Sequence, residues 1–207
     1  MNASLDLFSS GFKRIFILYS NTGVTAPTFS PRSLATLGGR MDVVSRAAIG
    51  AFLDLKNRIR EDVVFIAVLM GPPDPPRIIY IDPSDMSKVK NLSEEEMGNI
   101  ILEQLRKTPT VEEKQDIIDL VDMLYKNGFK VYLLIEDGTD IEHYIKSGHL
   151  SQKKLAFIIG DHIGFPNDLV KQLTRKSYPV SLGKKSYLAS HCVIFLNEIL
   201  DNVSLSR

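Results

Sequence analysis

Long apolar runs alternate along this chain with segments of helical periodicity. Uninterrupted apolar runs predict strands buried on both faces, and shorter apolar segments beside Gly and Pro predict two further strands. The predicted strands are residues 14–19, 63–70, 77–81, 130–135, 154–159 and 178–181. Apolar positions that recur every three to four residues predict helices over residues 41–55, 94–107, 110–127, 140–146, 166–176 and 186–203.

Polar residues at the ends of these segments support the predicted boundaries. Ser93 precedes three glutamates and Thr110 lies three residues before Glu113, so both are typical helix starts. Asn127 followed by Gly128 is a typical helix end. From there strands and helices alternate, which favours an α/β fold with a parallel-type sheet flanked by helices. Since no linker or repeat divides the chain, we expect a single domain over residues 1–207.

The composition is that of an ordinary globular protein, with 207 residues of which 44% are hydrophobic and 24% charged. The apolar runs are far shorter than the roughly 20 residues of a membrane span, so we expect no membrane partner. Residues 1–7 lack the basic and apolar segments of a secretory signal. The single cysteine, Cys192, excludes an intramolecular disulfide and favours a reducing, cytoplasmic setting. No spacing of His, Cys, Asp and Glu predicts a metal site.

Positive and negative side chains are segregated, although the formal net charge is zero. Residues 1–60 hold eight Lys or Arg against three acids, and residues 153–185 hold seven against two. Residues 91–127 hold nine acids against four bases. A basic face would attract a phosphate backbone, because the local field governs such binding more than the total charge. Ordinary solvated helix faces explain the same charges equally well.

Two glycine-containing turns follow predicted strands near the end of the chain. Residues 155–159 run into Gly-Asp-His-Ile-Gly at 160–164, and residues 181–186 read Ser-Leu-Gly-Lys-Lys-Ser before the last helix. Strands that stop at glycine expose main-chain N–H and C=O groups, and ligands bind at the carboxyl edge of a parallel sheet. The turns therefore predict a pocket built mainly from backbone. Tight turns without a ligand would need the same glycines.

Neither turn fits a standard nucleotide-binding motif. No G-x-G-x-x-G follows a strand, and a P-loop would need Gly in place of Tyr178 and Ser or Thr in place of Lys185. His162 alone is more typical of a hydrogen-bonded turn than of a ligand or base. Cys192 lies among core-like residues of a predicted helix, which favours a small buried hydrophobe over a nucleophile.

Arg40 and Asp42 stand at the start of a predicted helix, beside a long polar loop. Asp42 can simply favour the helix dipole while Arg40 is solvated. Alternatively, the guanidinium grips phosphate or a base and the carboxylate accepts a proton. The residues by themselves favour the first interpretation.

Several segments occur in the same order as in one known family. They are Gly-Gly-Arg-Met-Asp at 38–42 with Arg46, Arg-Glu-Asp-Val at 60–63, the proline-rich turn 71–76, Ile-Ile-Gly-Asp-His-Ile-Gly at 158–164, and 181–192 from Ser-Leu-Gly to His-Cys. With these segments the chain resembles the archaeal tRNA pseudouridine(54) N1-methyltransferases of the SPOUT superfamily over nearly its whole length. Members of that family often carry cysteine where this chain has Ser45.

The resemblance implies the SPOUT methyltransferase fold, with a C-terminal deep trefoil knot in the cofactor-binding part at about residues 128–207. It implies a homodimer, consistent with the apolar last helix, and S-adenosylmethionine as the cofactor. Glycines would let the main chain approach the adenine and ribose, and leucines would give apolar cover. The cofactor-binding residues that the resemblance implies are Leu134, Gly160, Leu182, Gly183, Lys184, Lys185, Ser186, Tyr187 and Cys192.

The resemblance also implies a reaction on tRNA, in which a methyl group passes to N1 of pseudouridine at position 54 in the T-loop. Within it, Asp42 is the candidate that assists loss of the N1 proton, and Arg40 the candidate that orients the base or its phosphate. Lys184 and Lys185 would contact the RNA. Two alternatives stay open: a sister SPOUT methyltransferase acting on pseudouridine in small-subunit ribosomal RNA or on another tRNA nucleotide, and a non-catalytic RNA-binding factor of the same fold.

Overall fold

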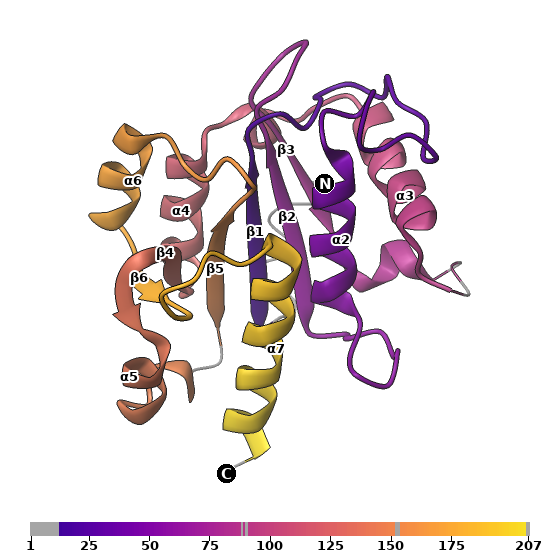
Figure 1. Cartoon of the computed structure of the whole chain (residues 1–207). Helices are drawn as coiled ribbons and strands as arrows, with labels where there is room; N and C mark the ends of the chain where they lie inside the picture. Colours follow the sequence, from indigo (N-terminus) through magenta and orange to yellow (C-terminus); the bar gives the residue numbers. More distant parts are fainter. Residues whose placement is uncertain (1–12, 88, 90, 152–153, 206–207) are drawn as a thin grey trace.

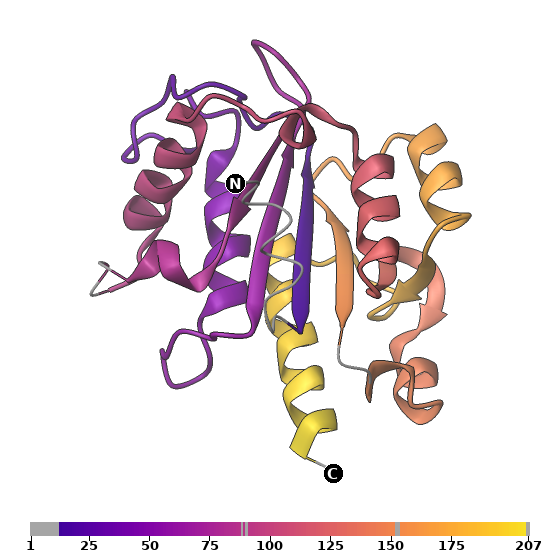
Figure 2. The same ribbon diagram turned by 180° about the vertical axis from the view of Figure 1, so that it is seen from behind.

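The computed structural model describes residues 13–87, 89, 91–151 and 154–205. These residues build a six-stranded sheet with the order β3-β2-β1-β5-β4-β6, covered by helices on both faces (Figures 1 and 2). The strands are β1 (Arg14–Ser20), β2 (Val63–Leu69), β3 (Arg77–Ile81), β4 (Lys130–Asp140), β5 (Leu155–Gly160) and β6 (Tyr178–Ser181). Neighbouring strands are parallel except β2 and β3, which are antiparallel. The predicted α/β fold with a mostly parallel sheet is confirmed.

The helices divide between the two faces of the sheet. They are α2 (Met41–Phe52), α3 (Glu94–Arg106), α4 (Ile117–Lys126), α5 (Ile141–Lys146), α6 (Asn167–Thr174) and α7 (Ala189–Leu205). Helices α2, α3 and α7 lie on one face, and α4 and α6 on the other (Figures 1 and 2). Alternate side chains of β1 enter the two cores: Phe16 and Leu18 face the first group, and Ile15 and Ile17 the second.

The prediction of one helix over residues 110–127 is wrong. The expected hydrogen bonds between Thr110 and Glu113 do form, at 2.8 and 3.3 Å, but they open only a 3₁₀ turn at Glu112–Lys114. Gln115 is extended, and the Asp116 carboxylate accepts from the N–H groups of residues 118 and 119. Because the extended Gln115 interrupts the helical backbone, helix α4 begins only at residue 117, after this second cap.

Three other boundaries differ from the prediction by three residues or more. Helix α2 ends at Phe52 rather than at 55, and Leu55 is exposed. Strand β4 continues beyond residue 135 to Asp140, because its later residues pair with β6 again after an irregularity in the register. Helix α7 begins at Ala189 rather than at 186, so the preceding loop is longer than expected. None of the helices within the described ranges is both long and apolar enough to cross a membrane.

Helix α7 is attached to α2 and β1 through Asn197, which is 1% exposed. The Asn197 Nδ2 donates to the carbonyl oxygens of Gly50 and Ala51, each at 3.1 Å, and Oδ1 accepts from Arg14 Nη1 at 3.1 Å. Those carbonyls lie in the last turn of α2, where intrahelical donors run out. A Cβ at Gly50 would lie 3.0 Å from Ile194, so glycine allows this close approach of the two helices.

Ion pairs reinforce this attachment at the end of the sheet where β1 begins. Asp201 of α7 receives Arg14 and Arg60, each at 2.6 Å, and Arg60 also pairs with Glu198 at 3.5 Å. The side chains of Arg14 and Arg60 are about nine-tenths buried, so these pairs are far less screened than surface pairs. These ion pairs lie at the opposite end of β1 from the carboxyl edge of the parallel strands.

Candidate active site

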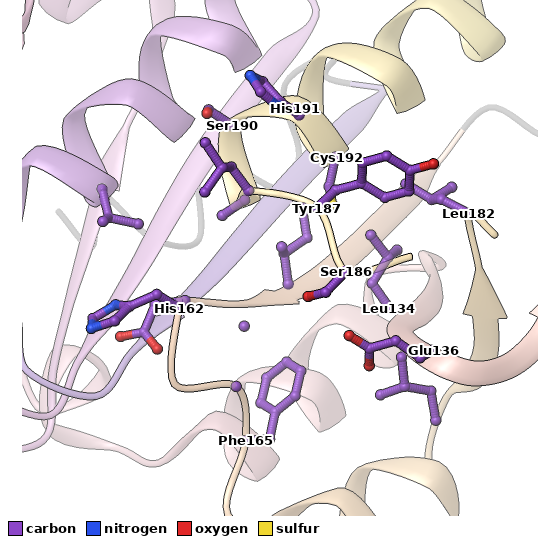
Figure 3. A pocket seen from close by; sticks show the side chains of 18 of the residues that line it. Leu134, Glu136, His162, Phe165, Leu182, Ser186, Tyr187, Ser190, His191 and Cys192 are labelled. Atoms are coloured by element: carbon purple, nitrogen blue, oxygen red, sulfur yellow. The ribbon is translucent and has the colours of Figure 1, made fainter. Parts of the chain in front are cut away.

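A cavity of about 720 Å³ lies beside the ends of β5 and β6 and the irregular middle of β4. These three neighbouring strands and the start of α7 form most of its wall, and α2 closes one side. The lining residues are 134–136, 159–165, 170, 180–183 and 185–192, with Arg40 directly before α2 and Val43 and Arg46 on it. Figure 3 shows Leu134, Glu136, Phe165 and Ser186 turned toward the same space. The carboxyl edge of this parallel sheet therefore holds a pocket of the size that binds a small molecule.

The structure brings most of the predicted cofactor residues together around this cavity. Eight of them line it, although they come from four separate stretches of the chain: Leu134, Gly160, Leu182, Gly183, Lys185, Ser186, Tyr187 and Cys192. Lys184 is exposed and is not among the lining residues. Contact of any of these residues with a ligand stays a prediction.

The turn after β5, residues 160–164, is closed tightly enough to require glycine. We call it the glycine turn. A Cβ at Gly160 would lie 3.1 Å from the Cα of Gly164 and 3.2 Å from the Phe165 ring. Gly164 has φ +81°, a conformation that costs other residues energy. The main chain therefore forms this part of the wall without side-chain obstruction.

Arg40, Asp42 and Arg46 form one charged group, the arginine cluster, at the start of α2. Arg40 donates from Nε and Nη2 to the two Asp42 oxygens at 2.9 and 3.1 Å. Arg46 Nη2 donates to the same carboxylate, and Arg46 Nε pairs with Glu94 at 3.1 Å. The Asp42 side chain is only 5% exposed, whereas each guanidinium-bearing side chain is nearly half exposed. The buried anion thus holds two cations toward the cavity.

This environment makes Asp42 a poor proton acceptor. Burial would raise the pKa of the Asp42 carboxyl, but hydrogen bonds from Arg40 and the charges of Arg40 and Arg46 outweigh it, so the pKa is lowered. A weakly basic carboxylate with both oxygens engaged is better suited to orienting the arginines than to taking a proton. The sequence interpretation gave roles to Arg40 and Asp42 but named Arg46 only among the segments that carry the family resemblance. The four-residue spacing from Asp42 places Arg46 on the same helix face.

Cys192 is partly buried in the cavity wall. Burial, with a smaller contribution from the negative charge of Glu136, raises the pKa of its thiol to about 11. The group is therefore a neutral thiol near pH 7, which agrees with the interpretation of Cys192 as a small hydrophobe.

Alkylation of Cys192 is expected to follow this raised pKa. Because only the thiolate reacts, the rate with iodoacetamide should rise about 10-fold per pH unit from pH 8 to 10 and level off only near 11. The chain has one cysteine, so intact mass reports this site alone. The urea-unfolded protein is the control and should react faster at pH 8. A plateau below pH 9 in the folded protein would contradict the buried thiol.

In the part of the chain that the structure describes, no three His, Cys, Asp or Glu side chains are grouped so that they could hold a metal ion. Among the described residues that line the cavity, the lysines and arginines are Arg40, Arg46 and Lys185. Lys153 and Asp6, which entered the charge counts, lie outside the described residues, as do residues 1–7 of the signal prediction.

Comparison with known proteins gives the class of this fold and cavity. A family model described as SAM-dependent RNA methyltransferase matches residues 13–205. The chain belongs to that family. Two relatives are tRNA (pseudouridine(54)-N(1))-methyltransferases. The one from Pyrococcus abyssi is 30% identical over 208 aligned positions, covering 93% of this chain and 99% of the relative. The one from Thermococcus kodakarensis is 33% identical, covering 92% and 100%.

A solved structure shares the fold. The crystal structure of Archaeoglobus fulgidus Nep1 bound to S-adenosylhomocysteine has a TM-score of 0.61 to this chain and is 16% identical. The comparison covers 94% of this chain and 99% of Nep1. The arrangement of strands and helices described above is therefore one that Nep1 also adopts.

Proposed function

We propose that this protein transfers a methyl group from S-adenosylmethionine to N1 of pseudouridine 54 in tRNA. The family gives the cofactor and the RNA substrate class, and the relatives from Pyrococcus and Thermococcus carry the name of this activity. The observation that carries the proposal is the cavity beside β4, β5 and β6, which has the arginine cluster on one side. A small-molecule pocket beside exposed cations fits a methyl donor next to an RNA strand.

The cavity residues fit S-adenosylmethionine in size and chemistry. The volume of about 720 Å³ lies within the range of cofactor sites. Leu134, Leu182 and Ile159 give apolar walls for an adenine ring, and the glycine turn lets main-chain groups approach it. When bound, the cofactor supplies an electrophilic methyl group on a sulfonium.

The residues around the cavity then position the reactants. Arg40 and Arg46, held by Asp42, would bind the RNA phosphates or orient the base beside the cavity. Holding two reactants in line can lower the barrier by about 7–11 kcal/mol, so positioning can carry most of the acceleration. Asp42 acts in this proposal through the arginines, and the N1 proton leaves to solvent.

We also propose a homodimer, a C-terminal knot and a cytoplasmic location. Leu188, Ile194 and Phe195 are 58%, 41% and 50% exposed at the start of α7, a concentration of apolar side chains suited to a second copy of this chain. Sedimentation at micromolar concentration tests the dimer, and a monomer would contradict it. The knot rests on the family resemblance, and the cytoplasmic location on the single cysteine.

Methylation of defined tRNA transcripts tests the function. Transcripts carrying either uridine or pseudouridine at position 54 are incubated with S-adenosylmethionine, and their nucleosides are analysed by mass spectrometry. We expect N1-methylpseudouridine from the pseudouridine transcript alone, because N1 of uridine is occupied by the glycosidic bond. If ribosomal RNA fragments are methylated and tRNA is not, the proposed methyl-transfer reaction stands and tRNA is not the substrate.

Cofactor binding can be measured without RNA. S-adenosylhomocysteine at about 100 times its Kd should stabilise the fold by about 2.7 kcal/mol, seen as a rise in Tm. Binding without methylation of any RNA would instead favour a non-catalytic RNA-binding factor. If neither S-adenosylmethionine nor S-adenosylhomocysteine raises the Tm, the assignment of the cavity as the methyl-donor site is contradicted.

A further inference from the structure

We propose that Asp161 and Asn21 are positioning residues for methyl transfer. Their paired side chains fix the distance between the glycine turn, on the cofactor side, and the arginine cluster, on the RNA side. The inference rests on the proposed function and adds to it a pair of residues in two separate segments of the chain. Asp161 lines the cavity, whereas Asn21 does not.

The contacts of Asp161 use both of its carboxylate oxygens. Oδ2 accepts from the Asn21 main-chain N–H at 2.7 Å, and Oδ1 accepts from Asn21 Nδ2 at 2.8 Å and from the Ile163 N–H at 2.9 Å. Asn21 Nδ2 also donates to the Gly164 carbonyl at 2.7 Å. Asp161 is only 8% exposed. The glycine turn is therefore held to the residue that follows β1 by several hydrogen bonds that water does not replace easily.

The same segment continues to the arginine cluster. Thr22, next to Asn21, donates from Oγ1 to the Gly39 carbonyl at 2.7 Å, and Gly39 directly precedes Arg40. A Cβ at Gly39 would lie 1.9 Å from the Thr22 carbonyl oxygen, and its φ is +59°. The two main-chain segments are thus in direct contact. A short series of contacts runs from the glycine turn through Asn21 and Thr22 to Gly39 and Arg40.

The hydrogen bonds of Asp161 favour a role in positioning over direct contact with the reacting atoms. The Asp161 oxygens already accept from three N–H donors, so the carboxylate is occupied by the protein itself. An Asn at position 161 has the same shape, but its NH₂ group would face one of these donors. One contact would then be lost while the cavity keeps its size. The expected result is a displaced glycine turn with cofactor binding largely preserved.

The test compares Asp161→Asn, Asn21→Ala and the double variant with the wild type. Single-turnover rates are measured at saturating tRNA and S-adenosylmethionine, and the Kd of S-adenosylhomocysteine is measured by calorimetry. We expect each single variant to lose about 10-fold or more in rate, with Kd changed by less than about 3-fold. The double variant should be no slower than the slower single variant, because the two side chains act as one unit.

Asp168→Asn is the matched control. Asp168 lies on α6 close to the glycine turn in sequence, but it is exposed and pairs only with Lys171 at 3.1 Å in the contacts described. Its rate and Kd should equal those of the wild type. Thermal unfolding of every variant shows that the assays are made on folded protein.

Three results with the variants would overturn the inference. Unchanged rates in folded Asp161→Asn and Asn21→Ala would remove the pair from the reaction. Multiplicative losses in the double variant would show two independent effects. A loss of S-adenosylhomocysteine affinity equal to the loss of rate would make Asp161 a ligand contact. A wild type that binds no S-adenosylhomocysteine overturns the proposed function and this inference together, whereas an active wild type with unaffected variants overturns this inference alone.

Discussion

Asp42→Asn is expected to lower the single-turnover rate of methyl transfer by about 100-fold, the cost of misplacing a reactant by about 1 Å. The Asp42 carboxylate is the buried anion that fixes both Arg40 and Arg46, and a neutral amide cannot accept from both guanidinium groups in the same way. Arg40 and Arg46 keep their positive charges in this variant. Affinity for tRNA should therefore change by only a few-fold, and its dependence on salt should be unaltered.

Glu94→Gln is the control for this experiment. Glu94 also pairs with Arg46, but its side chain is half exposed, and exposed pairs contribute little. The rate of this variant should stay within about 2-fold of the wild type, in keeping with a pair worth under about 1 kcal/mol. A full rate in folded Asp42→Asn would show that neither orientation of the arginines nor proton transfer depends on this carboxylate.

The second large effect is on stability, at Asn197. Asn197→Ala should lower the free energy of unfolding by about 3 kcal/mol, since it leaves two buried α2 carbonyls without their donor. It also removes one acceptor from the buried Arg14 guanidinium, which keeps its ion pair with Asp201. For a chain of this size the expected loss corresponds to a fall in Tm of roughly 6–12 °C. Urea unfolding, with the midpoint and slope fitted together, measures the change.

Asn99→Ala is the matched control for Asn197. Asn99 is exposed on α3, and alanine has the higher helix propensity, so stability should stay the same or rise slightly. Equal stability of the two alanine variants would mean that α7 is held to α2 by its apolar contacts alone. Comparing the free energies of unfolding of the two variants at the Tm of the wild type avoids extrapolation to other temperatures.

Local patterns in the sequence predicted the sheet and the edge that bears the cavity. The apolar runs gave strands close to their observed bounds, because a strand buried on both faces leaves little room for polar residues. The glycines at 160, 164 and 183 marked the strand-end turns for the same reason that they occur there, close approach or positive φ.

Long-range pairings could not be predicted in this way. The contact of Asp161 with Asn21 joins residues 140 positions apart, and no local sequence pattern predicts it. The extension of β4 to Asp140 depends on its partner β6. Likewise, the hydrogen bonds of both possible helix starts, at Thr110 and at Asp116, form, and nothing local in the sequence shows that only the second continues as helix α4. Arg46 is the exception, since helical spacing alone would have linked it to Asp42.

The hydrogen bond from Asn197 to Gly50 closes 147 positions of chain. During translation, α2 emerges long before the helix that covers it, and one wall of the cavity is missing until residues 182–192 have been made. If the methyl donor binds in this cavity as proposed, it can stabilise the polypeptide only after residues 182–192 have folded onto the sheet.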